Sequence, residues 1–429
     1  MPLPTDLQTT ITGIDAATPV VAAREMYYRA TQPAAYLSPK SLEALAGSLR
    51  LLAVNYPRLV VGSLAERLDL LGVDRAGVAD LGLWLTLRRA GIVELAGHVH
   101  TDRLAYGASY VTTWVDGAGR LTLTADTAAT MHVERDSATG ATLFAGRLWS
   151  TPATATTPAG RGAALMYSDH VDIYRTVTPA ASTSDAGAWQ LVDTIPHGLG
   201  VVPVVQFVRR PSSTDPEIGV SAFADIVTLV DALNKILADS LVTSEYFARP
   251  RRWATGLEIE VDEETGRPID PFGESRLLQS EAPDTKFGQL EPPSLAGYTD
   301  LVSTITQQIG ALTGLPPHYL GLAGNQPASA EGVNAAENQL VQRADTEQTA
   351  VSASWAAVFD LAAKITGSPA GDLMPRWGDT QSRTPAQDAD AAAKLAGIGV
   401  PLAALLPRLR FSPDDVALTT PTPAPVVAE

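Results

Sequence analysis

The feature that most constrains the fold is a long stretch without proline between residues 328 and 366. Apolar residues recur in it at steps of mostly three or four, which predicts one long helix with one buried face. These residues are Val333, Ala336, Leu340, Ala344, Val351, Trp355, Val358, Ala362 and Ile365. With a rise of about 1.5 Å per residue, such a helix is about 55 Å long, roughly the diameter of a whole domain. The steps break at Glu347–Gln348 and are too irregular for a coiled coil, so we expect the helix to span a large domain or an assembly.

Strong turn signals come directly before this helix. Gly314 and the pair Pro316–Pro317 stop a preceding helix, and a Gly/Asn/Pro loop covers residues 321–327. Ser329 then supplies a hydroxyl cap, and Glu331 places negative charge at the positive end of the helix dipole. We therefore predict a helix, a proline-stopped loop and a second, very long helix.

Composition excludes several classes of protein. The chain has 429 residues, of which 45% are apolar, which is enough for two or three domains with real cores. The absence of cysteine excludes disulfides and thiolate metal sites. The first ten residues lack the basic and apolar segments of a secretory signal, and no run of about 18 apolar residues predicts a membrane span. The net charge of −16 argues against a protein that grips nucleic acid, although it does not exclude one that touches DNA without holding it.

The first half of the chain reads as a mixed domain. Residues 1–20 are expected to form a flexible arm, followed by helices at 21–30, 38–55, 55–73 and 78–100, the last with Trp84 and Leu87 facing inward. From Gly107 the apolar period changes to two, which predicts hairpins that turn at residues 116–119 and 136–140. Strands are expected to continue to residue 174, and residues 197–210 read as a glycine turn followed by a buried strand.

The second half reads as helices around an insert. Ser221 is expected to cap a helix that ends at residue 249, on whose outer face Asp231, Lys235 and Asp239 stand four residues apart and can pair. Residues 251–293 shift to acidic, proline-rich, strand-like pieces. A return helix from residue 294 carries an apolar stripe of Leu295, Tyr298, Leu301, Ile305, Ile309 and Leu312, and a polar face of Thr299, Ser303, Thr306 and Gln307. After the long helix we expect a linker at 367–377, a helix pair at 386–398 and 401–409, and a disordered tail.

Candidate chemical sites are few. The chain contains neither a phosphate loop nor a GxSxG elbow. His98 and His100 could bind a metal if they lay on a strand, but they end a helical stretch and lack a third ligand. The acidic run from Glu258 to Glu264 could hold Ca²⁺, form a solvated hairpin edge or dock a basic partner. The basic run Arg249-Pro250-Arg251-Arg252 could contact DNA or a partner, or could simply balance the dipole at a helix C-terminus.

Several segments together resemble one known family, the portal proteins of tailed bacteriophages, in the group typified by the portal of the Bacillus phage SPP1 and common in actinobacterial phages. The resemblance covers residues 27–416 approximately and depends on the order and spacing of the segments, none of which is a catalytic fingerprint. The segments are NYPRLVVGSLAERL, RLAYGASYVTTWVDGAG, HGLGVVPVVQFVRR, GVSAFADIVTLVDALNKILADSLVTSEYFARPRR, TGLPPHYLGLAGNQPASAEGVNAAENQLVQRADTEQ and QDADAAAKLAGIGVP.

The resemblance implies an α+β portal fold with named parts. They are a flexible arm (1–20), a mixed wing (21–218), a first stem helix (219–248), a β-rich clip insert (249–293), a second stem helix (294–314), a tunnel loop (315–329), a long wing helix with its linker (330–375), a helical crown (376–418) and a disordered tail (419–429).

The same resemblance implies three sets of functional residues. The tunnel loop would line the channel with Gly321, Leu322, Gly324, Asn325, Gln326, Pro327 and Ser329. The clip would dock the terminase motor through Arg251, Arg252, Glu258, Glu260, Asp262, Glu263 and Glu264. The stem would face the channel with Asp231, Lys235, Asp239, Thr299, Ser303 and Thr306.

By the resemblance, the chain is a structural protein without catalytic residues, cofactor, metal or membrane. It would form a homo-oligomeric ring, expected to hold twelve copies, at one capsid vertex of the virion, after assembly in the host cytoplasm. Its partners would be double-stranded DNA without sequence specificity, the terminase large subunit, the major capsid and scaffolding proteins, and a head-completion adaptor. Twelve copies of −16 give −192, and such a passage would repel phosphate and let DNA slide. No Lys or Arg lies between Thr313 and Gln342, so a basic grip by the loop is not expected.

Two alternatives from other classes remain at this point. One is an enzyme, such as a hydrolase with an acidic pair in the mixed domain, which would require a deep pocket and a carboxylate with a shifted pKa. The other is a different ring-forming connector protein, such as a head–tail adaptor, against which the helix–insert–helix order speaks.

Overall fold

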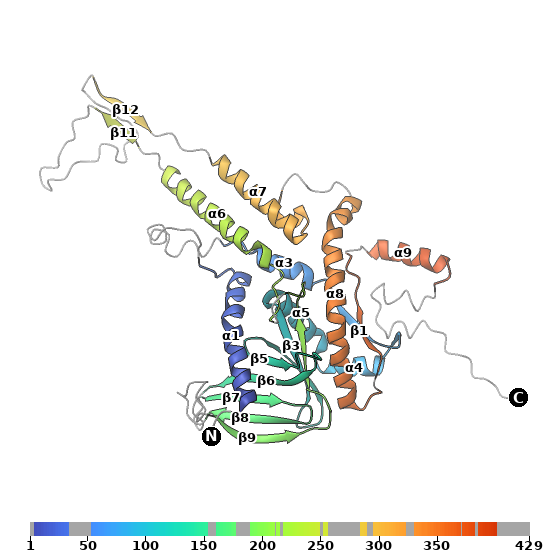
Figure 1. Cartoon of the computed structure of the whole chain (residues 1–429). Helices are drawn as coiled ribbons and strands as arrows, with labels where there is room; N and C mark the ends of the chain where they lie inside the picture. The colour runs from blue at the N-terminus through green and yellow to red at the C-terminus, as the bar shows by residue number, and fades with distance from the viewer. Residues whose placement is uncertain are drawn as a thin grey trace. The chain divides into compact units, whose positions relative to one another are not determined.

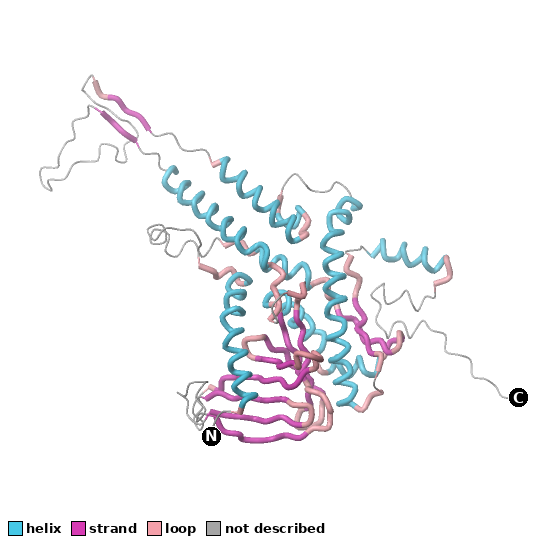
Figure 2. Tube along the Cα trace, in the orientation of Figure 1, coloured by secondary structure: helices cyan, strands magenta, loops and turns pink. Residues whose placement is uncertain are grey.

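Figure 1 shows a computed structural model of the chain. The structure describes residues 4–33, 53–152, 160–176, 189–210, 212–214, 218–248, 252–255, 284–289, 295–322, 330–369, 371–381 and 385–400. The chain divides into two compact units. One comprises residues 1–32, 55–227 and 310–429, and the other comprises residues 33–54 and 228–309. Helices and strands are both abundant, so the expected mixed α+β class is confirmed (Figure 2).

The hairpins of the first unit follow the predicted period of two. Strands β3 (Ala108–Val115) and β4 (Leu121–Thr127) pair antiparallel around the predicted turn, with Val115 opposite Leu121. The Asp116 carboxylate caps this turn by accepting the backbone N–H of Ala118 at 2.9 Å. Strand β10 (Val204–Val208) pairs with β3 on its other side, as expected for the buried apolar strand.

A five-stranded antiparallel sheet follows in the order β5-β6-β7-β8-β9. Its strands are β5 (Met131–Arg135), β6 (Thr142–Thr151), β7 (Gly160–Met166), β8 (His170–Thr176) and β9 (Trp189–Pro196). The second predicted hairpin, between β5 and β6, is confirmed. The Asp136 carboxylate accepts the backbone N–H groups of Ala138 and Thr139, which fixes its turn.

The flexible arm expected at residues 1–20 is wrong, because helix α1 runs from Thr5 to Tyr28 and packs on β5, β6 and β7. Leu7, Ile11 and Ile14 lie one turn apart on its buried face and join a core cluster with the sheet. The backbones approach closely, since a Cβ placed on Gly146 would come within 2.1 Å of the Thr10 hydroxyl. The burial of apolar surface therefore holds helix α1 on the sheet, and each Å² of apolar surface removed from water contributes about 25 cal/mol to stability.

The predicted long helix is α8 (Ala330–Thr366), with 37 residues. Its expected stripe is buried from Leu340 to Ala362, and Trp355 is completely buried. Around Trp355 lies the main core of the unit, built from α4 (Leu81–Arg89), α5 (Ile92–Tyr106), α8 and the strands β1 (Leu70–Arg75), β3, β4, β10 and β13 (Leu373–Trp377). Trp84 and Leu87 belong to this core, as predicted.

Three predicted boundaries are corrected. The helix expected over residues 55–73 is α3 (Tyr56–Ala65) followed by strand β1 (Leu70–Arg75). The helix expected over 78–100 is strand β2 (Val78–Ala79), then α4 and α5, which are separated because Gly91 adopts a left-handed φ of 80°. The expected linker at 367–377 contains β13 (Leu373–Trp377), which pairs antiparallel with β1 and thus belongs to the sheet β13-β1-β2. Helix α9 (Pro385–Gly397) matches the first helix of the expected pair, and the second lies outside the described residues.

The second unit is built on two antiparallel helices. Helix α6 (Val227–Ala248) follows a short 3-10 turn at Ala224–Ile226, so it begins six residues after the cap expected at Ser221, whose side chain is buried. Helix α7 (Ala296–Thr313) returns, and the Thr243 hydroxyl near the end of α6 lies 3.2 Å from the Tyr298 hydroxyl near the start of α7. The backbone N–H of Val54 donates to the Asn234 side chain at 3.0 Å, which ties residues 53–54 to α6 rather than to the expected wing.

Candidate functional site

The charged candidates of the first stem helix lie on α6 as predicted. Asp231, Lys235 and Asp239 are each half-buried and stand one turn apart. The Lys235 ammonium forms an ion pair with the Asp239 carboxylate, and both side chains are more than one-third exposed. An exposed pair of this kind contributes at most about 1 kcal/mol to stability, so it is a feature of the helix surface rather than of the core.

Of the polar residues expected on one exposed face of α7, some are accessible to solvent and one is buried. Thr299 is exposed, and Ser303, which is half-buried, accepts a hydrogen bond from Gln307 at 3.3 Å. Thr306, however, is only 2% exposed, so its expected role as a channel-facing residue is wrong in this structure. The covered face of α7 passes through Thr306, Ile309 and Gly310, so of the predicted apolar stripe Ile309 is buried while the leucines are not.

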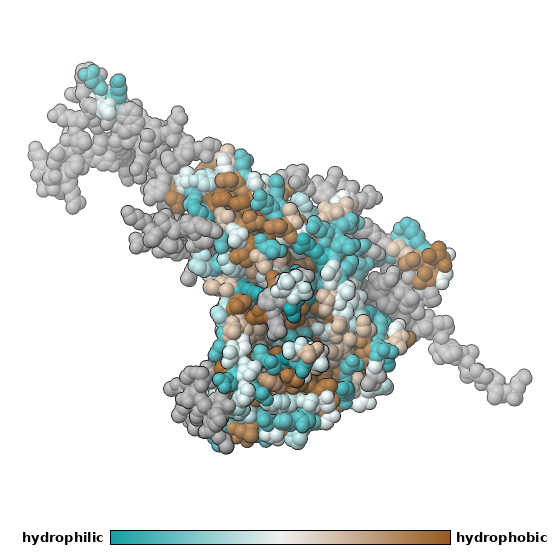
Figure 3. All heavy atoms as spheres, in the orientation of Figure 1, coloured by the Kyte–Doolittle hydropathy of each residue, from teal (hydrophilic) through white to brown (hydrophobic). Residues whose placement is uncertain are grey.

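The leucine stripe of α7 is consequently left open to solvent. Leu301 is 51% exposed and Leu312 is 46% exposed, and eleven residues, or three turns, separate them on one flank of the helix. On α6, Leu241 is also 43% exposed. Figure 3 shows apolar side chains gathered on the visible face of these two helices. Two helices with uncovered apolar flanks are typical of a surface that another protein subunit covers.

The insert between the two helices contains a two-stranded ribbon. Strand β11 (Arg252–Thr255) pairs antiparallel with β12 (Lys286–Gln289), and Arg252 lies opposite Gln289. The ribbon agrees with the expected β-rich character of this segment. The other docking candidates, Arg251, Glu258, Glu260, Asp262, Glu263 and Glu264, lie outside the described residues.

The segment between α7 and α8 turns where glycine and proline predicted it. Gly314 has a φ of 72°, and its N–H closes the end of α7 on the carbonyl oxygen of Gly310 at 2.8 Å. A short 3-10 turn at Pro317–Leu320 follows, and Gly321 then adopts a left-handed φ of 70°. Leu322 is half-buried. The remaining loop candidates, Gly324, Asn325, Gln326, Pro327 and Ser329, lie outside the described residues.

A buried carboxylate fixes this turn to the long helix. Glu337 of α8 accepts a hydrogen bond from Arg67 at 3.0 Å and from the Tyr319 hydroxyl at 3.2 Å. The His318 ring nitrogen Nε2 lies 3.7 Å from the same carboxylate. Glu337 is 5% exposed, so the 3-10 turn that leads into the loop is held by a charge-assisted contact in a low-dielectric site.

At Glu347, where the apolar stripe of α8 is interrupted, the structure has a buried cluster of charged side chains, here called the ionic core. The Glu347 carboxylate accepts from Arg103 of α5 at 2.5 Å and from Arg209, which follows β10, at 2.7 Å. Burial alone would raise the pKa of Glu347, but the charges and hydrogen bonds of the two arginines outweigh it and hold the pKa below its ordinary value. In the sequence Glu347 reads as an interruption of the stripe, although a carboxylate on a buried helical face also predicts a buried cationic partner.

The metal hypothesis for His98 and His100 is wrong. They lie two residues apart on α5, so His98 is exposed while His100 is 1% exposed. Nε2 of His100 accepts a hydrogen bond from the Trp355 indole N–H at 2.9 Å, and burial lowers the pKa of His100 to about 3. His100 is therefore a neutral core residue. Within the described residues no group of His, Asp and Glu is arranged to hold a metal ion.

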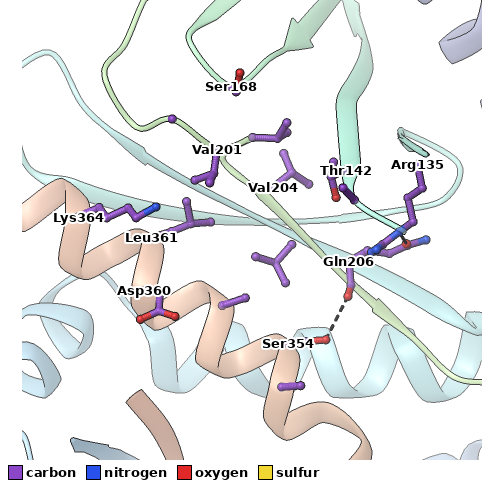
Figure 4. Close-up of a pocket in the computed structure, with 16 residues that line it drawn as sticks. Arg135, Thr142, Ser168, Val201, Val204, Gln206, Ser354, Asp360, Leu361 and Lys364 are labelled. Atoms are coloured by element: carbon purple, nitrogen blue, oxygen red, sulfur yellow. Dashed lines mark hydrogen bonds between the residues drawn. The ribbon is translucent and has the colours of Figure 1, made fainter. Parts of the chain in front are cut away.

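A pocket of about 610 Å³ lies between the sheet ends and α8 (Figure 4). Valine, leucine and alanine side chains form its floor, and Arg135, Asp360 and Lys364 are its charged residues. Burial raises the pKa of Asp102 to about 6 and also raises the pKa of Asp126, but neither residue lines this pocket. The acidic pair required by the hydrolase hypothesis is thus not assembled at this pocket.

Comparisons with known proteins identify a family. The family model described as "Phage portal protein, SPP1 Gp6-like" matches residues 27–416. The portal protein of Mycobacterium phage L5 is 29% identical over 417 residues, which cover 91% of this chain and 81% of that protein. The portal protein of Mycobacterium phage D29 is 30% identical over 386 residues, which cover 84% of this chain and 75% of that protein.

Solved structures give weaker likenesses. A chain from the virion of a native gene transfer agent particle has a TM-score of 0.49 and 16% identity, covering 92% of this chain and 99% of that one. A chain from the neck of the native particle, computed with C12 symmetry, has the same TM-score and identity. Likenesses at this TM-score do not by themselves establish a shared fold. Among the described helices, none combines the length and the apolar character that a membrane crossing requires.

Proposed function

The chain belongs to the SPP1 Gp6-like family of phage portal proteins, and we propose that it acts as a closed ring of about twelve copies that conducts DNA through one capsid vertex. Proteins of this family are structural rather than enzymatic. In this proposal the ring guides the genome during packaging and ejection, nucleates capsid assembly with the capsid and scaffolding proteins, and is assembled in the host cytoplasm before it becomes part of the virion.

The observation that carries the ring is the uncovered apolar flank of helices α6 and α7. Leu301 and Leu312 of α7 and Leu241 of α6 are each more than 40% exposed, although all three are large apolar side chains. Covering the exposed half of one such leucine stabilises an interface by about 1 kcal/mol. A closed ring with a head-to-tail interface covers this flank on every copy, whereas a monomer leaves it in water.

The proposed channel would be polar and negatively charged. Twelve copies, each with a net charge of −16, carry −192, which disfavours tight binding of phosphate and so permits sliding. Asp231, Lys235, Asp239, Thr299 and Ser303 are the solvent-accessible candidates for the channel surface, whereas Thr306 is buried. The loop that begins at Gly321 would line the narrowest point.

The insert at residues 249–293 is the proposed docking site for the terminase large subunit and, later, for a head-completion adaptor. Its support is the β11–β12 ribbon, which α6 and α7 flank in sequence, together with the acidic run at Glu258–Glu264. Because the ribbon is an insert between two helices, it can carry a docking partner while α6 and α7 keep their pairing. Helix α9 would belong to the proposed crown.

Replacing residues 251–293 with a short Gly/Ser turn tests the docking role. The ring should still form, as judged from the mass in solution, and terminase binding should be lost. The matched control replaces the β3–β4 turn at residues 116–119 with a Gly/Ser turn of the same length, which should leave both properties unchanged. Retained terminase binding by the deletion variant would show that the insert is not the docking site.

A further inference from the structure

The outermost strand of the five-stranded sheet is unusually exposed. Strand β9 pairs with β8 on one side, and within the described strands nothing pairs with its other edge. Every side chain from Gln190 to Pro196 is exposed. Leu191, Val192 and Ile195 are 48%, 55% and 38% exposed, so an apolar surface faces solvent along this edge.

The edge is built for contact by side chains rather than for pairing by another strand. Its register with β8 shifts so that Val192 has no partner residue: Leu191 lies opposite Tyr174, and Asp193 opposite Ile173. A bulge of this kind and the proline at position 196 both obstruct strand addition. Beyond the bulge, Asp193 and Ile195 share one face of the sheet, about 7 Å apart. The edge therefore presents a carboxylate beside an apolar side chain.

The pocket beside α8 has complementary properties. Its floor is formed by Val201, Val204 and Leu361, and its cations are Arg135 and Lys364 (Figure 4). Arg135 is engaged, since its Nε donates to Gln206 at 3.2 Å and its Nη1 to the Gly140 carbonyl at 3.0 Å. Lys364 is exposed, and no ion pair is formed by it with any residue that the structure describes. A partner that brings an acid beside an apolar side chain would fit this pocket.

The spacing of the two surfaces also agrees. Leu361 and Lys364 lie three residues apart on α8, so their Cβ atoms are about 5–6 Å apart. Asp193 and Ile195 are about 7 Å apart on β9. One partner strand can therefore place an apolar side chain against Leu361 and, at the same time, a carboxylate against Lys364. The remaining carboxylate of the pocket, Asp360, has an oxygen, Oδ1, that is buried and lacks a hydrogen-bond partner in the described chain, so a donor from the occupant would also be accommodated.

The two surfaces lie on different parts of the same unit. No residue of β9 lines the pocket, whose lining comes from β5, β6, the turn before β8, the segment after β9 and α8. A contact between two different surfaces of identical chains is heterologous and repeats from copy to copy. With a net charge of −16, a second copy is an acidic partner, which suits a pocket that contains two cations and one acid.

We propose that β9 of one copy docks into the α8 pocket of the next copy, with Ile195 on the apolar floor and Asp193 paired with Lys364. This docking depends on the proposed ring and specifies one of its subunit contacts. It would cover the exposed edge of β9 and the pocket on every copy, in addition to the α6–α7 flank.

The chain contains no cysteine, so introduced cysteines report this contact directly. A variant with Ile195→Cys and Ala357→Cys, treated with a short bismaleimide, should give a ladder of dimers, trimers and larger oligomers on a denaturing gel. The control combines Ile195→Cys with Ala350→Cys, which lies on the same face of α8 but outside the pocket lining and about 10 Å along the helix from Ala357, and should give no ladder. Cross-linking that stops at the dimer, or an absent ladder from a protein that forms rings, would overturn the docking.

Charge reversal supplies a second, independent readout. Either Asp193→Lys or Lys364→Asp alone should raise the protein concentration at half-assembly by about tenfold, and the two together should restore it. Glu94→Lys, an exposed reversal on α5, is the control and should change nothing. If the wild-type protein forms rings and both single reversals leave assembly unchanged, the proposed docking of β9 is refuted but the ring is not. A wild-type protein that remains monomeric refutes the ring, and the docking with it.

Discussion

The ionic core around Glu347 allows a quantitative test. Glu347→Gln retains the shape of the side chain and one acceptor oxygen, so it removes charge without creating a cavity. Arg103 is 2% exposed and would keep a positive charge that nothing compensates. Arg209 is 18% exposed and also donates to the carbonyl oxygens of Val220 and Ser221, so it would be relieved in part by water.

Removing one partner of a buried ion pair typically costs about 3–5 kcal/mol of unfolding free energy. Because one arginine is deeply buried and the other is partly solvated, we expect about 4 kcal/mol for Glu347→Gln. For a domain of this size, that corresponds to a Tm lowered by roughly 10 °C. Adding Arg103→Gln removes the more costly uncompensated charge and should recover about half of the loss.

Urea unfolding followed by far-UV circular dichroism measures this free energy, with Glu66→Gln as an exposed control that should cost less than about 0.5 kcal/mol. The pKa of Glu347 is lowered in the folded state, so its stabilisation is present above the ordinary value near 4.5 and is lost as the pH falls through the lowered pKa. The difference between wild type and variant should thus be constant from pH 8 to about pH 5 and shrink below it. A cost under about 1 kcal/mol at pH 7 would refute a buried, charge-dependent core.

Three further perturbations test other parts of the structure. Gly314→Ala should cost about 1–2 kcal/mol in urea unfolding, because the residue has a φ of 72° and a Cβ would come within 2.9 Å of Arg343; an unchanged midpoint would contradict the turn. Asp102→Asn should raise stability by about 1–3 kcal/mol at pH 7.5 and by almost nothing near pH 4, because burial raises the pKa of Asp102 to about 6 and the folded state therefore disfavours its charge above that pH; an equal gain at both pH values would argue against burial as the cause. Gly146→Val should displace α1 from the sheet, because Thr10 occupies the space of the new side chain, and hydrogen exchange of residues 5–28 should accelerate at least tenfold; unchanged protection would contradict the docked helix.

Local chemistry explains what could be predicted from the sequence. The two hairpins follow from a period of two and from Asp/Gly turns, whose signals lie within a few residues. The long helix follows from one uninterrupted apolar stripe, and the glycine–proline stop before it is equally local. The helix–insert–helix order of the second unit has the same basis, because stripes and breaks in composition are visible along the chain.

The predictions from the sequence are wrong where contacts between residues far apart in the chain determine the structure. Strand β13 has little pattern of its own, and its pairing partner β1 lies about 300 residues earlier in the sequence, so it read as a linker. Helix α1 contains Pro19 and several threonines, and the close approach between Thr10 and Gly146 that secures it cannot be seen in either segment alone. Thr306 was assigned to an exposed face because helix α7 was assumed to bury its leucines.

The oligomeric state tests the central claim most directly. Mass photometry of the purified protein, with negative-stain images of the same sample, should give a particle near twelve times 45.1 kDa with a central hole. Leu301→Lys, which charges the uncovered flank of α7, should shift that population toward smaller species. A single population at 45.1 kDa at every protein concentration, both alone and with the scaffolding protein of the same phage, would contradict the account.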